Sequence, residues 1–111
     1  MRVPAVVVPL ALGLLLAACA APTGVPDREP EVTGVVTAAD DPDGPRLAQP
    51  SDDYYEGMLI LGGDPHVVTS DGGDLDPAEL RDGDEVALWV ADACAESFPV
   101  QCTVEVVQVR G

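Results

Sequence analysis

The chain of 111 residues contains no lysine, and its only basic side chains besides one histidine are five arginines. All twenty aspartates and glutamates follow Cys19, where four arginines leave a side-chain charge of −16. Such a surface repels phosphate backbones and anionic headgroups, which argues against nucleic acid as a partner. It would attract cations or basic proteins, although high acidity also serves solubility alone.

Histidine and cysteine are also scarce, with one His66 and three cysteines in the whole chain. The single histidine and the absence of a second pair of cysteines argue against a structural zinc site. None of the serines lies in the sequence context of a nucleophile elbow. We therefore expect no cofactor and no catalytic activity, since a hydrolase would need His66, a carboxylate and a serine in one cleft.

The N-terminus has the pattern of a targeting segment. Arg2 is followed by an apolar run that ends at Ala18, too short for a typical spanning helix, which predicts a signal peptide over residues 1–18. The run ends in "LAAC", which resembles a bacterial lipobox. That resemblance implies cleavage before Cys19 and a diacylglyceryl group on its thiol. The alternative is a plain secretory signal with an incidental cysteine.

A lipid on Cys19, with acyl chains such as palmitate, would anchor the protein to the cell membrane on its extracytoplasmic side. Cys94 and Cys102 then remain as an even pair, and an oxidising compartment favours a disulfide between them. Residues 19–30, rich in proline and in small or charged residues, predict an extended tether. Residues 31–111 form one domain, which we expect to be monomeric and to bind an extracytoplasmic protein or small ligand.

Short apolar segments separated by turn-forming residues predict an all-β domain. Residues 39–53 have no periodicity and predict a long loop, and Asp76 can cap a short helix that begins at Pro77. The expected strands cover residues 32–38, 55–62, 66–70, 85–91 and 102–109. This order predicts a small five-stranded OB-like barrel with one short helix between strands 3 and 4. An immunoglobulin-like sandwich is the alternative, but it needs seven strands.

Three finer expectations follow from the same patterns. The strands at 55–62 and 66–70 should pair across a tight turn at two adjacent glycines. Trp89 should lie on the face of its strand opposite Val86, Leu88 and Val90. In the last strand the inward alternation shifts after residue 106, which predicts a β-bulge.

Two stretches, "LRDGDEVALWV" from Leu80 and "AESFPVQ" from Ala95, resemble the C-terminal half of the YobA-like family of small secreted or lipid-anchored bacterial proteins. Phe98 stands where that family has tyrosine, and the two cysteines depart from its pattern. The matching residues are Leu80, Gly83, Asp84, Val86, Ala95, Glu96, Ser97, Pro99 and Gln101. The resemblance implies an OB-like barrel and an extracytoplasmic location, and it implies no activity.

The stretch "CAESFPVQC", from Cys94 to Cys102, could be a redox site, a metal site, a binding loop or a structural staple. Catalytic dithiols usually have two residues between them, so the seven here argue against redox chemistry. A structural disulfide that closes a loop of this length stabilises a domain by about 2.5 kcal/mol. The staple is therefore the simplest interpretation.

The same stretch resembles the disulfide-closed inhibitory loop of Bowman–Birk serine protease inhibitors, in the form C-x-x-S-x-P-x-Q-C. In that resemblance Glu96 fills the primary specificity pocket of the protease, Ser97 follows the scissile bond and Pro99 is cis. A rigid loop of this kind limits the entropy cost of binding. If the loop is only a fold motif, Phe98 should be buried. If it is a binding loop, Glu96, Ser97 and Phe98 should be exposed.

Calcium is the remaining ligand candidate. The stretch "SDGGDLD" places Asp71, Asp74 and Asp76 on a glycine-containing loop, and Ca²⁺ prefers several carboxylate oxygens. The spacing does not fit an EF-hand, because the required glycine is missing. The alternative is a set of solvated acidic turns.

Overall fold

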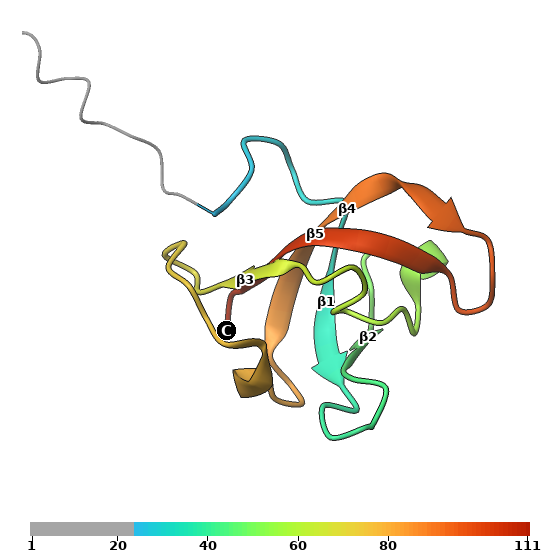
Figure 1. The fold of residues 1–111 in the computed structure, drawn as a ribbon, viewed down its shortest axis with the longest axis horizontal. Coiled ribbons are helices and arrows are strands. Elements are labelled where there is room, and N and C mark those ends of the chain that lie inside the picture. Colours follow the sequence, from blue (N-terminus) through green and yellow to red (C-terminus); the bar gives the residue numbers. More distant parts are fainter. Residues whose placement is uncertain (1–23) are drawn as a thin grey trace, which may run out of the picture.

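Five strands in one curled sheet make up most of the regular structure of residues 24–111, the part of the chain that the computed structural model describes (Figure 1). The predicted signal peptide and Cys19 lie outside this range. The strands are β1 (Val32–Thr37), β2 (Arg46–Ala48), β3 (His66–Val68), β4 (Glu85–Ala95) and β5 (Gln101–Val109). Two short 3₁₀-helices are η2 (Asp53–Tyr55) and η3 (Pro77–Glu79).

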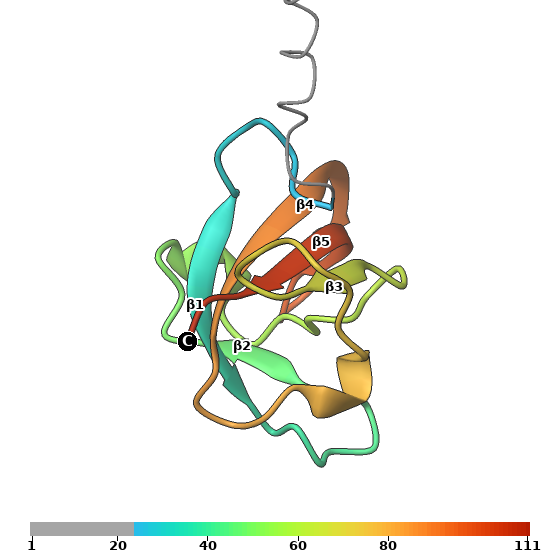
Figure 2. The ribbon, with the colours of Figure 1, turned by 90° about the vertical axis from the view of Figure 1, so that its left-hand side faces the viewer.

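The sheet order is β2-β1-β4-β5-β3, with β3 parallel to β5 and all other pairs antiparallel. Residues 57–62 bridge β2 and β5, which are not neighbours in this order. The Leu47 amide in β2 donates to the carbonyl of Met58 at 2.9 Å, and the Val104 amide in β5 donates to that of Gly62 at 2.8 Å. The sheet therefore curls around a common interior (Figure 2), which confirms the predicted small all-β barrel.

The predicted helix between the third and fourth strands is also confirmed, as a single 3₁₀ turn. The Asp76 carboxylate accepts the Ala78 amide at 2.9 Å, and Pro77 occupies the first position. A capping side chain replaces a backbone acceptor that the first turn lacks.

Residues 55–62 differ from the prediction. They form no regular strand, and β3 pairs with β5 and not with them. The backbone takes positive φ values at Gly57, Gly63 and Asp64, and such positions interrupt an extended ladder. Conversely, β2 lies inside the predicted loop. Its three residues are too few for any alternation to be visible in the sequence.

The barrel interior is apolar, and β4 and β5 contribute to it as the alternation predicted. The core cluster consists of Val32, Val36, Leu47, Met58, Ile60, Val67, Leu80, Val86, Leu88, Val90, Val100, Cys102, Val104 and Val107. Val104 and Val107 both face inward because Glu105 is an extra residue opposite the Trp89–Val90 step. The predicted bulge in the last strand is therefore present, about one residue earlier than expected.

Trp89 lies outside this cluster, as predicted, and is nevertheless only 2% exposed. Its indole N–H donates to the carbonyl oxygen of Arg28 at 2.7 Å, and the Arg28 guanidinium contacts Glu31 at 3.2 Å and Glu105 at 2.8 Å. Residues 24–31 thus pack over the outer face of the sheet. The described part of the predicted tether is in contact with the barrel.

Glu31 fixes this covering segment to β4, where its carboxylate accepts the Val90 amide at 2.6 Å. Burial by itself raises the pKa of Glu31. The hydrogen bond from Val90 and the nearby Arg28 guanidinium outweigh that effect, and the pKa of the Glu31 carboxyl is lowered. The ionised form of Glu31 is therefore the one that suits this position.

Gly34 in β1 tests how tightly the barrel is packed. A Cβ atom there would lie 2.7 Å from Cδ1 of Leu47 and 2.8 Å from the carbonyl oxygen of Ala48. We expect Gly34→Ala to lower the free energy of unfolding by about 1–3 kcal/mol, because overpacking forces neighbours to shift. Gly73→Ala is the matched control, since its Cβ meets only Thr69 at 3.6 Å. Equal urea-unfolding midpoints for the two variants would contradict this packing.

Candidate functional site at the disulfide-closed loop

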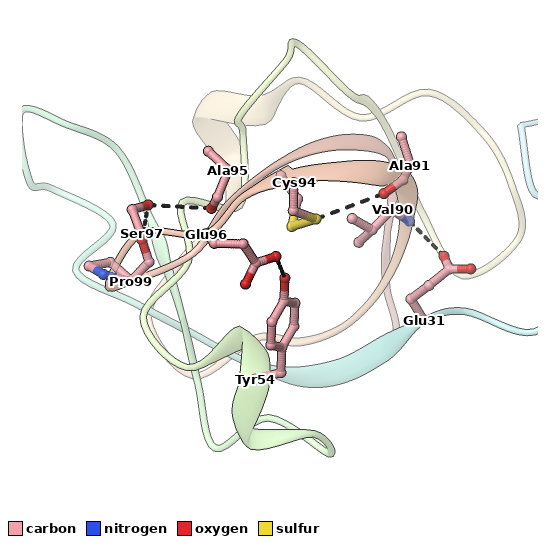
Figure 3. The surroundings of a disulfide bond; sticks show 10 residues. Glu31, Tyr54, Val90, Ala91, Cys94, Ala95, Glu96, Ser97 and Pro99 are labelled. Carbon is pink, nitrogen blue, oxygen red and sulfur yellow. Dashed lines mark hydrogen bonds between the residues drawn. A yellow bond between two sulfur atoms is a disulfide. The ribbon is translucent and has the colours of Figure 1, made fainter.

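The disulfide predicted from the cysteine count is present where β4 ends and β5 begins (Figure 3). Cys94 and Cys102 are bonded to each other and are cross-strand partners, with their Cα atoms 4.2 Å apart. Neither residue pairs with a further strand, because β1 contacts β4 only up to Leu88 and β3 contacts β5 only from Val106 onward. The disulfide therefore closes a two-stranded ribbon that extends beyond the rest of the sheet.

Inside the loop, backbone and side-chain bonds define one tight turn. The Ser97 amide donates to the carbonyl of Ala95 at 2.8 Å, and the Ser97 hydroxyl donates to that of Pro99 at 2.8 Å. The Phe98–Pro99 peptide bond is cis. Val100 is only 4% exposed and belongs to the core cluster. The loop is thus attached to the barrel on its C-terminal side.

A second attachment holds the N-terminal side of the loop. The Tyr54 hydroxyl on η2 donates to Oε2 of Glu96 at 2.5 Å (Figure 3). This hydrogen bond is the main cause that raises the pKa of Tyr54 to about 12, because loss of the phenol proton would leave two negative charges in contact. Asp52, whose carboxylate caps η2 by accepting the Tyr54 amide at 3.0 Å, adds negative charge nearby.

Phe98 has no such attachment and its side chain is fully exposed, at 101% of the reference area. Tyr54, at 44%, is the other exposed large hydrophobic residue within residues 24–111. Glu96 and Ser97 are exposed as well. Burial of Phe98, expected if the loop were only a fold motif, does not occur. The loop has instead the exposure expected of a binding loop.

The calcium candidates are not brought together. The Asp74 carboxylate lies 2.7 Å from Nε2 of His66, Asp76 caps η3, and Asp71 is exposed in the turn before them. Within residues 24–111 there is no group of three or more His, Cys, Asp or Glu side chains that could hold a metal ion. The His66–Asp74 pair is exposed to solvent, and in the described part of the chain no serine hydroxyl bonds to it.

Comparison of the chain with protein-family models, with curated proteins and with solved structures finds no match. The likeness to the YobA-like family therefore remains a prediction from the residues quoted above. Among the described residues, no helix is both long enough and apolar enough to cross a membrane.

Sequence reasoning identified the loop and its cysteines but not the side chain that holds the loop in place. Tyr54 and Glu96 are separated by 42 positions, and nothing local in either segment indicates that they meet. Gly57 and Pro99 also meet although they are distant in the sequence, because a Cβ atom on Gly57 would lie 3.5 Å from Cβ of Pro99. Both contacts depend on how η2 packs beneath the loop.

The Tyr54–Glu96 hydrogen bond gives a testable pH dependence. Because the pKa of Tyr54 is raised above its usual value near 10, the stability that this bond contributes is present below about pH 10 and is lost as the pH rises towards 12. We expect Glu96→Gln to lower the pKa of Tyr54 towards 10, as followed by the ultraviolet absorbance of the phenolate. Tyr54→Phe assigns the transition to this residue. An unchanged transition in Glu96→Gln would rule out the contact.

Proposed function

We propose that this protein is a non-catalytic binding module, held at the extracytoplasmic face of the cell membrane by a lipid on Cys19, and that residues 96–98 are its binding element. One observation carries the proposal, namely the full exposure of Phe98 on a loop closed by the Cys94–Cys102 disulfide. Large aromatic side chains are frequent energetic centres of protein interfaces. A loop fixed at both ends also has little conformational entropy left to lose on binding.

The place of the loop in the barrel supports a binding role. It joins β4 to β5, and in five-stranded OB-type barrels this connection is one of the two loops that commonly contact ligands. The likeness is one of architecture, so it indicates where a ligand would bind and not which ligand. The side-chain charge of −16 still argues against nucleic acid.

The orientation of the loop supports the same role. Gly24 lies beside β3, where a Cβ atom on it would come within 3.0 Å of Val68, whereas the loop lies at the other end of the β4–β5 pair (Figure 1). Cys19 precedes Gly24 by five residues, which span at most about 18 Å. A lipid on Cys19 would therefore keep the β3 end near the membrane and leave the loop directed away from it.

Affinity purification of the full-length protein from its native membranes tests this function. Phe98→Ala should reduce recovery of the extracytoplasmic proteins that copurify with the wild type by at least about tenfold, because the aromatic anchor is lost. Glu79→Ala on the remote η3 is the control and should recover them fully. Cys19→Ser should move the protein from the membrane to the soluble fraction. Equal recovery with Phe98→Ala would refute the role of the loop.

A second candidate function is inhibition of a glutamate-specific serine protease, because the Glu96–Ser97 peptide is exposed on the closed loop. The contact of Glu96 with Tyr54 would have to open before the carboxylate could enter a protease pocket. Tyr54→Phe should therefore inhibit such a protease more strongly than the wild type. Absence of inhibition by both proteins, or rapid cleavage after Glu96, would eliminate this candidate.

A further inference from the structure

The loop residues on both sides of Phe98 are held in place by contacts to the domain or within the turn. On one side the Glu96 carboxylate accepts the Tyr54 hydroxyl, and on the other Val100 lies in the core. The Ser97 hydroxyl is bonded within the turn, to the carbonyl of Pro99. The loop is therefore stiff on both sides of Phe98 and projects this one side chain, so a surface that receives it must be concave and apolar.

The surroundings of Phe98 are acidic. Asp52, Asp53 and Glu56 flank Tyr54 on and beside η2, and Glu96 contacts Tyr54 directly. Asp52 accepts the Tyr54 amide at 3.0 Å and Glu96 accepts the Tyr54 hydroxyl, so both carboxylates contact the same residue.

Arg46 contacts this region but does not offset its acidic charge. Arg46 donates to the carbonyl of Gly57 at 3.2 Å, and Gly57 packs against Pro99 of the loop. The Arg46 guanidinium is already paired with Asp43 at 3.6 Å. A partner that buries Phe98 must therefore lack carboxylates at the rim of the contact, since like charges facing each other cost several kcal/mol, and basic side chains there would complement the acidic charge.

These features exclude two other binding partners for the loop. An anionic membrane surface would be repelled by the same carboxylates, and the loop lies at the end of the barrel opposite Gly24 (Figure 1). A second copy of this chain would bring another acidic surface, because each copy carries −16 after Cys19. A protein with basic side chains meets both requirements.

We infer that Phe98 inserts into an apolar pocket of a partner protein, and that arginine or lysine side chains at the rim of this pocket contact the carboxylates around Tyr54. The inference rests on the proposed binding function and adds the chemistry of the partner. The apolar insertion would supply most of the affinity, whereas the charges would supply specificity and a fast association rate.

Photo-crosslinking from position 98 tests this inference in the full-length protein on its native membranes. The photoreactive amino acid p-benzoylphenylalanine replaces Phe98, and the crosslinked peptides of the partner are sequenced. Excess full-length wild-type protein serves as competitor, and its Phe98→Ser variant as the control competitor. We expect crosslinks to a protein segment with apolar residues flanked by arginine or lysine, and competition by the wild type but not by Phe98→Ser.

Charge is tested in the same assay with two matched double variants. Asp53→Asn with Glu56→Gln removes two charges beside Tyr54, and Asp71→Asn with Glu79→Gln removes two charges from the turn after β3 and from η3. The first pair should lower the crosslink yield about fivefold at low salt, and the second should leave it unchanged. Raising the NaCl concentration from about 50 to about 500 mM shortens the screening length roughly threefold and should abolish the difference.

The outcomes separate the partner chemistry from the binding function. A competed protein crosslink whose yield responds equally to the two double variants would overturn the basic rim and leave the binding function intact. Crosslinks to lipid or to a second copy of this chain would overturn the assigned partner. Absence of any competed crosslink would overturn both the partner and the loop as binding element. The salt-dependent difference between the variants supports the inference.

Discussion

The disulfide between Cys94 and Cys102 closes the β4–β5 ribbon where neither strand has another neighbour in the sheet. A two-stranded ribbon is marginally stable in water by itself. The covalent closure removes much of its unfolded freedom, and burial of Val100 adds an apolar anchor. The Tyr54–Glu96 hydrogen bond then sets the loop against η2. The exposure of Phe98 has a fixed geometry only because these three constraints act together.

The sequence predicted those features that depend on local spacing. Alternation placed Val86, Leu88 and Val90 inward and Trp89 outward, and the shift late in β5 indicated a bulge. The cysteine count indicated the disulfide. Residues 55–62 were wrongly predicted because apolar composition suggested a strand, whereas three positive φ values nearby break it into turns. Amino-acid composition does not reveal the backbone φ angle of a residue, and the turn-forming residues alone did not show where the predicted strand is interrupted.

The sequence identified the segment that forms the candidate site, but not which of its side chains are exposed or which distant residues contact it. Phe98 lies between polar and apolar neighbours in a motif without periodicity, so its burial depends on whether the barrel reaches over it. The barrel does not, because β1 ends its pairing with β4 at Leu88. Tyr54 became part of the site through a contact over 42 positions. Such contacts follow from the packing of whole elements and leave no pattern in one sequence.

Residues 24–31 add a constraint that bears on the proposed anchoring. They cover Trp89, and the ionised Glu31 binds the β4 backbone through the Val90 amide. Because the pKa of Glu31 is lowered, the stability it contributes is present above the ordinary carboxyl pKa and is lost as the pH falls through the lowered value. At neutral pH the segment is therefore part of the folded domain. The free tether behind a lipid on Cys19 would be short.

The acidic surface around the loop explains how an exposed aromatic residue can be tolerated. Isolated apolar side chains on a surface are common, and aggregation requires that they meet others in a contiguous patch. Here the nearest exposed aromatic residue, Tyr54, lies among carboxylates, and two copies would bring these charges together before Phe98 could be buried. The same charges would favour a basic partner over long range. The acidity that would keep copies apart would thus also select the proposed partner.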